Sequence, residues 1–134
     1  MKYLCLFICV LSFFVSGCDV TIPTITDNEN NTNSLAPKGT KLTGKASYYA
    51  DKFNGKPTAS GQKFDNKLFT AAHKTLPFGT RLNVKNLKNN KIVVVTVNDR
   101  LPKTSTREID LSQAAAKALD MIRDGVVQVE INVL

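Results

Sequence analysis

The residues best suited to chemistry form a polar triplet, Asn98, Asp99 and Arg100, at the end of a β-branched segment. Residues 92–97 are isoleucine, valine and threonine, which favour a strand over a helix. Polar residues do not alternate within this segment, which predicts a strand buried on both faces. Asp99 is the best candidate for acid–base chemistry, at the point where this strand leaves the core. The alternative is a turn at Asn98 and Asp99, with a charge pair between Asp99 and Arg100.

The cysteine and histidine content argues against a metal site or another cofactor. The three cysteines are Cys5, Cys9 and Cys18, all near the N-terminus, and His73 is the only histidine. A Cys/His ligand cluster cannot be assembled from these residues in the rest of the chain. We therefore expect no metal and no cofactor, and no disulfide to stabilise the folded domain.

The N-terminus has the features of a bacterial lipoprotein signal. Lys2 precedes an apolar run that is too short to span a membrane with margin, and small residues directly precede Cys18. This arrangement resembles a lipobox and implies cleavage after residue 17, with lipidation of Cys18 and anchoring to a membrane of the cell envelope, facing the periplasm. Asp19 slightly favours the inner membrane. The alternative is an ordinary signal peptide or a transmembrane anchor.

Residues 18–42 are expected to form a flexible linker, and residues 43–134 a single domain. The linker contains a run of eight residues, 27–34, without an apolar side chain, which cannot bury enough surface to order itself. The whole chain carries a formal net charge of +7. Outside the cytoplasm, a basic surface favours anionic lipids or an acidic wall polymer over nucleic acid. We therefore expect no nucleic-acid partner.

The pattern from residue 43 onward predicts an all-β domain. Strands are expected at residues 44–50, 68–73, 81–87, 91–97 and 126–133, and a short helix at 113–122 with Gly125 just past its end. With the segment at residues 107–112, we count about six strands and one short helix. A sheet this small, without disulfides, is best completed by closure into a barrel, which removes its edges.

Six short motifs occur in the order and spacing of the rare lipoprotein A (RlpA) family, and the resemblance covers residues 44–134. The motifs are Gly44-Lys-Ala-Ser-Tyr-Tyr49, Thr58-Ala-Ser-Gly61, Thr70-Ala-Ala-His73, Leu76-Pro-Phe-Gly-Thr80, Val97-Asn-Asp-Arg100 and Ile109-Asp-Leu-Ser112. The resemblance implies a six-stranded double-psi β-barrel. It also implies a lytic transglycosylase that cleaves peptidoglycan glycan strands between N-acetylmuramic acid and N-acetylglucosamine in cell-wall remodelling, with septal proteins as further partners.

Carried over position by position, the resemblance places the catalytic residues at Gln62, His73 and Asp99. Gln62 is the main departure, because active family members carry a glutamate there. In the implied reaction the 6-hydroxyl of muramic acid attacks its own anomeric carbon, so that one carboxyl, Asp99, can give and then take the proton. His73 is expected to orient or assist Asp99, the alternative being a buried, hydrogen-bonded histidine. An amide at residue 62 leaves open a non-catalytic, expansin-like glycan-binding protein.

Other residues of these motifs are candidates for binding the glycan. Tyr48 and Tyr49 point to opposite faces of a strand, so at most one can stack on a sugar. Asp110 has two interpretations, a sugar contact or the N-cap of the helix, which Ser112 could also provide. The further expected substrate-binding residues, for which turn formation or a charge pair is the alternative, are Thr58, Ser60, Gly61 and Arg100.

Overall fold

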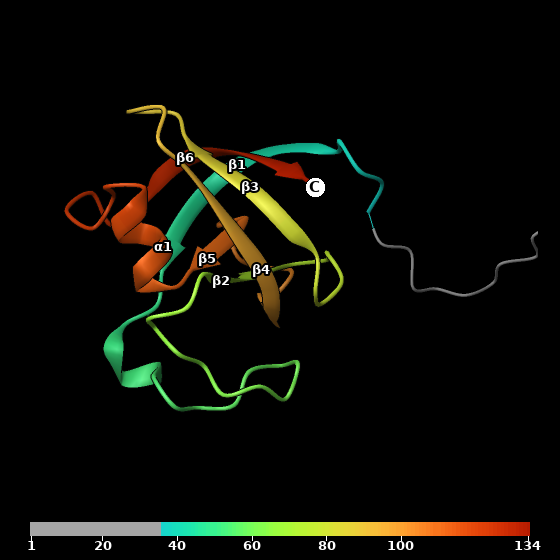
Figure 1. Cartoon of the computed structure of the whole chain (residues 1–134), viewed down its shortest axis with the longest axis vertical. Coiled ribbons are helices and arrows are strands. Elements are labelled where there is room, and N and C mark those ends of the chain that lie inside the picture. Colours follow the sequence, from blue (N-terminus) through green and yellow to red (C-terminus); the bar gives the residue numbers. More distant parts are fainter. Residues whose placement is uncertain (1–35) are drawn as a thin grey trace, which may run out of the picture. The chain divides into compact units, whose positions relative to one another are not determined.

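The computed structural model describes residues 36–134, which form a closed β-barrel (Figure 1). Its strands are β1 (Lys41–Tyr48), β2 (Thr70–His73), β3 (Arg81–Asn86), β4 (Ile92–Arg100), β5 (Ile109–Leu111) and β6 (Val127–Val133). The strand order around the barrel is β1-β5-β2-β4-β3-β6, and β6 pairs with β1 to close it. The expected six-stranded barrel is therefore confirmed. Its two helical segments are the 3₁₀ turn η1 (Asp51–Phe53) and α1 (Gln113–Ala118).

Two parallel strand pairs bring distant parts of the chain together. β1 pairs in parallel with β5, and β2 pairs in parallel with β4, whereas the remaining neighbours are antiparallel. A long connection, which contains η1, joins β1 to β2 and lies below the barrel in Figure 1. Alternate side chains of the strands fill the interior. The largest apolar side chains of this core are Leu82, Ile109, Leu111, Leu119, Met121 and Ile131, each with 0% exposure.

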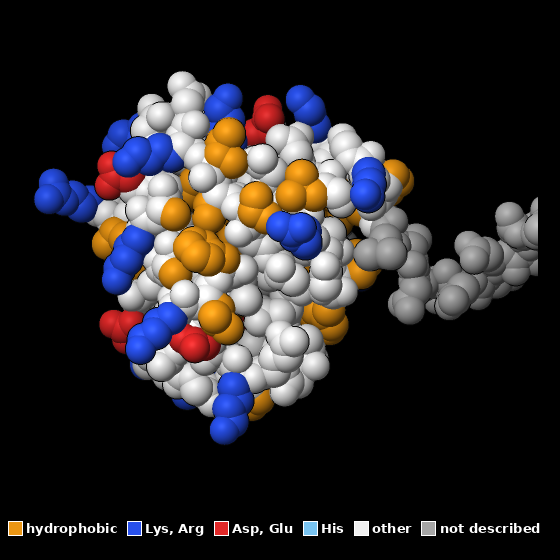
Figure 2. Space-filling model, in the orientation of Figure 1, with side chains coloured by type: hydrophobic (Ala, Val, Ile, Leu, Met, Phe, Trp, Pro, Cys, Tyr) orange, Lys and Arg blue, Asp and Glu red, His pale blue; other side chains and the backbone are white. Residues whose placement is uncertain are grey.

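The first half of β4 is buried on only one face, so the expectation of two buried faces is wrong. Val93, Val95 and Val97 point into the core, whereas Ile92 and Val94 are 54% and 37% exposed. Hydrophobic side chains are accordingly visible among scattered Lys and Arg side chains on the surface (Figure 2). β-Branched residues on both faces of β4 therefore reflect strand propensity rather than burial of both faces.

Helix α1 is shorter than the sequence pattern indicated. It ends at Ala118, with Leu119 as its C-cap, instead of continuing to residue 122. Asp120 then adopts a positive φ of 53°, so the chain reverses well before Gly125. Ser112 is the N-cap, because its side chain accepts a hydrogen bond from the backbone N–H of Ala115. The interpretation of Asp110 as the N-cap is therefore wrong.

The N-terminal predictions fall on residues that the structure does not describe. The signal peptide (residues 1–17), Cys18 and most of the linker lie outside residues 36–134, and β1 begins at Lys41, slightly before the expected domain start at residue 43. Within residues 36–134, no helix is both long and apolar enough to cross a membrane. The same residues hold no cluster of three His, Asp or Glu side chains that could bind a metal.

Candidate active site

A row of four residues crosses the outer face of the barrel, one from each of four neighbouring strands. Ser47 of β1 pairs with Asp110 of β5, Asp110 with Ala72 of β2, and Ala72 with Asp99 of β4. Directly paired residues carry their side chains on the same face of a sheet. The small side chain of Ala72 therefore separates two carboxyl groups. The row brings residues from four parts of the sequence into one surface.

A shift in the β2–β4 register carries Asp99 onto this face. Ala71 pairs with Val97, but the next residue, Ala72, pairs with Asp99, so that Asn98 is the extra residue of a bulge. Val97 is fully buried in the core. A bulge places two consecutive residues opposite one partner and re-aims their side chains. The bulge therefore places the side chains of Asn98 and Asp99 next to each other at the point where β4 leaves the core.

Three hydrogen-bond donors converge on the carboxyl of Asp99. The hydroxyl of Tyr49 donates to Oδ2 at 2.5 Å. The backbone N–H groups of Ala59 and Arg100 donate to Oδ1 at 2.9 and 2.8 Å. Asp99 itself remains partly exposed. The carboxyl is thus held in one orientation and is still open to a ligand, as a proton-transferring group requires.

The loop that carries Gln62 folds back onto β4 as a small hairpin. Pro57 and Lys63 form an isolated antiparallel bridge, and Gly61 adopts the positive φ of 86° that its tip requires. The N–H of Ser60 donates to the carbonyl of Asn98 at 3.3 Å. The side-chain amide of Asn98 lies 3.4 Å from Oε1 of Gln62. The structure therefore brings Gln62 to the residue that precedes Asp99.

Thr58 and Ser60 stabilise this hairpin from within. Thr58 is buried, and its hydroxyl lies 2.9 Å from that of Ser60 and donates to the carbonyl of Gln62 at 3.0 Å. These contacts are the turn chemistry that was the alternative to sugar binding. Ser60 and Gly61 lie at the hairpin tip beside β4, where contact with a ligand remains a prediction.

Asp110 is buried beneath an arginine. Arg107 donates from Nε to Oδ1 at 2.8 Å and from Nη2 to Oδ2 at 3.0 Å, and the hydroxyl of Ser47 donates to Oδ1. Such a bidentate pair fixes a carboxylate geometrically. Both oxygens of Asp110 are therefore occupied, whereas Asp99 has only uncharged donors. Of the two carboxyl groups in the row, Asp99 is the better placed for proton transfer.

His73 does not contact Asp99, contrary to the expected orienting role. Its side chain is fully buried, and Nδ1 accepts hydrogen bonds from the backbone N–H groups of Thr75 and Leu76 at 3.2 and 3.1 Å. Nε2 lies 3.2 Å from Oε1 of Glu108. Since Nδ1 accepts, the neutral imidazole carries its proton on Nε2. Ala72, and not His73, pairs with Asp99, and adjacent strand residues face opposite sides.

Burial of His73 predicts a pH-dependent stability. Burial lowers the pKa of His73 from its ordinary value of 6.5, with Glu108 opposing the effect and Arg100 and Lys74 reinforcing it. Below about pH 6.5, His73 therefore binds a proton in the unfolded chain but stays neutral in the folded chain. The free energy of unfolding falls as a result. In His73→Asn, the amide oxygen can replace Nδ1 as the acceptor. We expect this variant to lose less stability than the wild type between pH 7.5 and pH 5, a range that spans the pKa of a free histidine. Urea unfolding of both proteins measures this, and parallel curves would contradict it.

Tyr48 and Arg100 serve the scaffold in this structure. The ring of Tyr48 packs against the core, and its hydroxyl donates to the carbonyl of Ile122 at 3.0 Å. Arg100 donates from Nη1 to the carbonyls of His73 and Leu76 at 3.1 and 2.7 Å. Arg100 therefore holds the loop after β2, and no charge pair with Asp99 is formed. The expectation that the two tyrosines face opposite sides agrees with their different partners.

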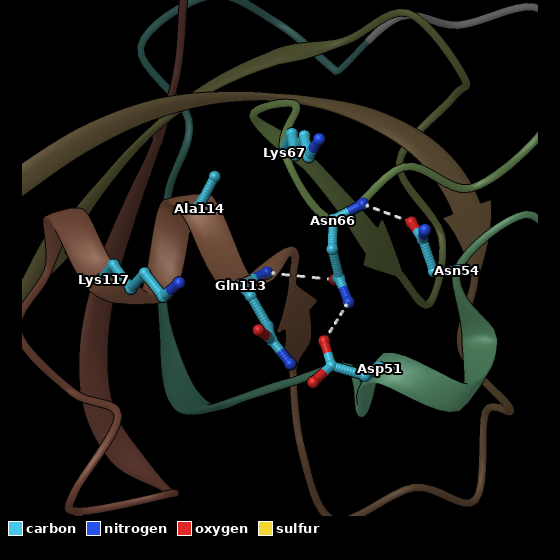
Figure 3. Close-up of a pocket in the computed structure, with 7 residues that line it drawn as sticks. All are labelled: Asp51, Asn54, Asn66, Lys67, Gln113, Ala114 and Lys117. Atoms are coloured by element: carbon cyan, nitrogen blue, oxygen red, sulfur yellow. Dashed lines mark hydrogen bonds between the residues drawn. The ribbon is translucent and has the colours of Figure 1, made fainter.

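A separate cavity of about 600 Å³ lies between η1, α1 and the end of the long connection. Asn66 is central to it: the side-chain amide donates to Asp51 at 3.1 Å and Oδ1 accepts from the N–H of Gln113 at 3.3 Å (Figure 3). The backbone N–H of Asn66 also donates to Asn54 at 3.0 Å. None of the four row residues lines this cavity. Its hydrogen bonds tie the end of the long connection to η1 and α1.

Sequence reasoning missed three groups at the site. The N–H of Ala59 is a backbone donor, which any residue except proline could supply, so its identity carries no signal. Ser47 belongs to the first of the six motifs, but its pairing with Asp110 depends on the β1–β5 register. Arg107 precedes Asp110 by three residues. Because β5 begins only at Ile109, the chain before it can bring Arg107 back onto Asp110, and the sequence alone did not indicate where β5 begins.

Comparison with known proteins identifies the family. Residues 41–131 match the family model described as lytic transglycolase. A protein of Treponema pallidum is 58% identical over 66% of this chain and 28% of its own length, and one of Aquifex aeolicus is 55% identical over 69% and 41%. Both are named probable endolytic peptidoglycan transglycosylase RlpA. The chain spans less than half the length of these curated relatives.

Solved structures support the fold. Streptomyces papain inhibitor is 30% identical, with a TM-score of 0.60 over 73% of this chain and 97% of the inhibitor. An expansin of Clavibacter michiganensis in complex with cellohexaose is 19% identical, with a TM-score of 0.57 over 71% of this chain and 50% of the expansin, and shows the fold alone. These neighbours have double-psi barrels, which confirms the expected fold. The chain belongs to the lytic transglycolase family, together with the RlpA proteins.

Proposed function

We propose that this protein is a lytic transglycosylase that cleaves peptidoglycan glycan strands between N-acetylmuramic acid and N-acetylglucosamine. The observation that carries the proposal is the carboxyl of Asp99, which is partly exposed and fixed by three donors on the outer face of the barrel. The names of the relatives support this substrate. One of them is the endolytic peptidoglycan transglycosylase RlpA of Haemophilus influenzae, which is 53% identical over 68% of this chain and 32% of its own length.

The chemistry needs only one proton-transferring carboxyl. Protonated Asp99 gives its proton to the glycosidic oxygen as the bond to the muramic acid anomeric carbon breaks. The 6-hydroxyl of the same sugar then attacks that carbon, and Asp99 takes up the hydroxyl proton, which regenerates the acid. The products are a 1,6-anhydro-muramic end and a free 4-hydroxyl on the N-acetylglucosamine. Because no water is consumed, the second carboxylate of a hydrolytic glycosidase is not required.

Gln62 supports a second candidate function, a non-catalytic glycan-binding protein. Its amide lies beside Asn98 and transfers no proton at ordinary pH. Incubation of the protein with purified glycan strands separates the two functions. New 1,6-anhydro ends, detected by mass spectrometry, support the enzyme, whereas intact strands that co-sediment with the protein support binding alone.

The surface charge of the chain supports an acidic polymer as the substrate. The formal net charge is +7, and Lys and Arg side chains are prominent on the face shown in Figure 2. Such an excess raises the local concentration of an anionic polymer such as peptidoglycan with its stem-peptide carboxylates. Septal proteins remain a proposed class of partner, suggested by the resemblance to the family.

We further propose that the protein is anchored at Cys18 to a membrane of the cell envelope and faces the periplasm. The small residues before Cys18 and the apolar run that precedes them support this, and Asp19 favours the inner membrane. We expect Cys18→Ala to move the protein from the membrane fraction to the soluble periplasmic fraction, because several acyl chains anchor a protein firmly. Immunoblotting of the fractions measures this, and equal membrane retention of both proteins would contradict it.

A further inference from the structure

We infer that Tyr49 is a positioning residue that fixes the carboxyl of Asp99 with Oδ2 as the reacting oxygen. This inference rests on the proposed function. Oδ1 of Asp99 already accepts two backbone hydrogen bonds, from Ala59 and Arg100. Oδ2 accepts one, from the hydroxyl of Tyr49. Since each carboxyl oxygen has two lone pairs, Oδ2 is the oxygen that keeps a free position for the proton in transfer.

The ring of Tyr49 is held on several sides and is therefore a poor platform for a sugar. Its centroid lies 4.4 Å from that of Phe64 in a tilted arrangement and 5.8 Å from that of Phe53, edge to face. Aromatic pairs of this kind stabilise the packed arrangement beyond the surface that they bury. The two phenylalanines belong to the long connection, so the ring also attaches that connection to the site.

Two hydrogen bonds hold the backbone of Tyr49 in place. Its N–H donates to the carbonyl of Leu111 at the end of β5, at 2.9 Å. Its carbonyl accepts a hydrogen bond from the side chain of Gln113, the first residue of α1, at 3.4 Å. Tyr49 therefore reaches Asp99 from a backbone that two other elements hold. This is the preorganisation that a positioning group needs, because small displacements cost much catalytic rate.

The charges around the phenol keep it a donor. Burial, the hydrogen bond to Asp99 and the negative charges of Asp99 and Asp110 raise the pKa of Tyr49 above its ordinary value, and Arg107 opposes them. The phenol therefore stays protonated wherever the carboxyl is charged. Tyr49 donates to one lone pair of Oδ2 in that state, which leaves the other lone pair for the proton in transfer.

The test compares Tyr49→Phe with Tyr48→Phe. Tyr49→Phe keeps the aromatic packing and removes only the hydroxyl. We expect kcat to fall by about 10–10²-fold with KM within about twofold of the wild type. The reaction starts from protonated Asp99, so we also expect the alkaline limb of the pH–rate profile, on which activity is lost as the pH rises, to move to higher pH, because a donor that favours the charged carboxyl is lost. Tyr48→Phe, which removes the bond to Ile122 in the core, is expected to lower stability without moving that limb.

A second readout does not depend on activity. In Tyr49→Phe, the amide signals of Ala59 and Arg100, the two donors to Oδ1, should shift in heteronuclear NMR spectra, and those of β6 should not. A raised KM with unchanged kcat would make Tyr49 a sugar-binding residue and overturn the inference, as would unchanged kcat and amide signals. If the wild type makes no anhydro ends, the proposed function fails, and the inference fails with it even if the amide signals shift.

Discussion

Asp99→Asn abolishes nearly all formation of 1,6-anhydro ends. We expect a loss of about 10²–10⁴-fold in kcat/KM, the usual contribution of one general acid–base group. Asparagine can keep the bonds from Ala59 and Arg100 through its side-chain oxygen, and the hydroxyl of Tyr49 can accept from its NH₂. The fold and the hairpin should therefore persist. The loss should also exceed that in relatives with a glutamate at the position of Gln62, since no second carboxyl stands beside Asn98 here.

The matched control is Asp120→Asn. Asp120 adopts a positive φ of 53°, which asparagine tolerates well, and its side chain is 75% exposed. The same change in chemistry at this distant turn should leave kcat/KM within about twofold. Initial rates of anhydro-end release by both variants, together with their thermal unfolding, measure this. An Asp99→Asn protein that is folded and retains a tenth or more of wild-type activity would contradict the role of Asp99.

Gln62→Glu raises the rate of cleavage. Oε1 of Gln62 accepts from the side-chain amide of Asn98 at 3.4 Å, and a glutamate oxygen can accept the same bond, so the substitution fits the observed hairpin. It would add a carboxyl next to Asn98, which directly precedes Asp99. If this group transfers protons, we expect a gain of about 10–10²-fold in kcat, part of the range that general acid–base groups supply.

Gln128→Glu is the control for the added charge. Gln128 lies on the exposed side of β6, away from the row that contains Asp99. Both variants lower the net charge equally, so a loss of substrate attraction should affect their KM values alike. A gain in kcat with Gln62→Glu alone assigns acid–base chemistry to residue 62. Equal kcat values in the wild type and both variants would show that residue 62 transfers no protons.

The sequence predicted most of the barrel because local patterns determine the strands. β-Branched residues marked β4, and alternating side chains marked β3 and β6. The length of α1 was overestimated because the apolar pattern continues past Ala118, although the chain turns at Asp120. The burial of β4 was overestimated because β-branched side chains also favour exposed strand positions, as at Ile92.

The site was only partly predictable because its geometry depends on long-range pairing. The motifs pointed to Asp99, and the register places Asp110 and Ser47 in the same row. Whether His73 faces Asp99 depends on which residue of β2 pairs with Asp99. Because of the bulge at Asn98, that residue is Ala72 and not His73. Sequence motifs show which residues are near one another along the chain, but they do not show on which face of the sheet each side chain lies. The packing of Tyr49 against Phe64 likewise depends on the path of the long connection.

The most direct test of the central claim is to digest purified glycan strands in water enriched in ¹⁸O and to analyse the new ends by mass spectrometry. Transglycosylation by Asp99 uses the sugar's own 6-hydroxyl, so we predict 1,6-anhydro-muramic ends without ¹⁸O, which are absent with Asp99→Asn. Reducing ends that carry ¹⁸O would show hydrolysis and contradict the single-carboxyl chemistry. Strands that stay intact would contradict catalysis altogether.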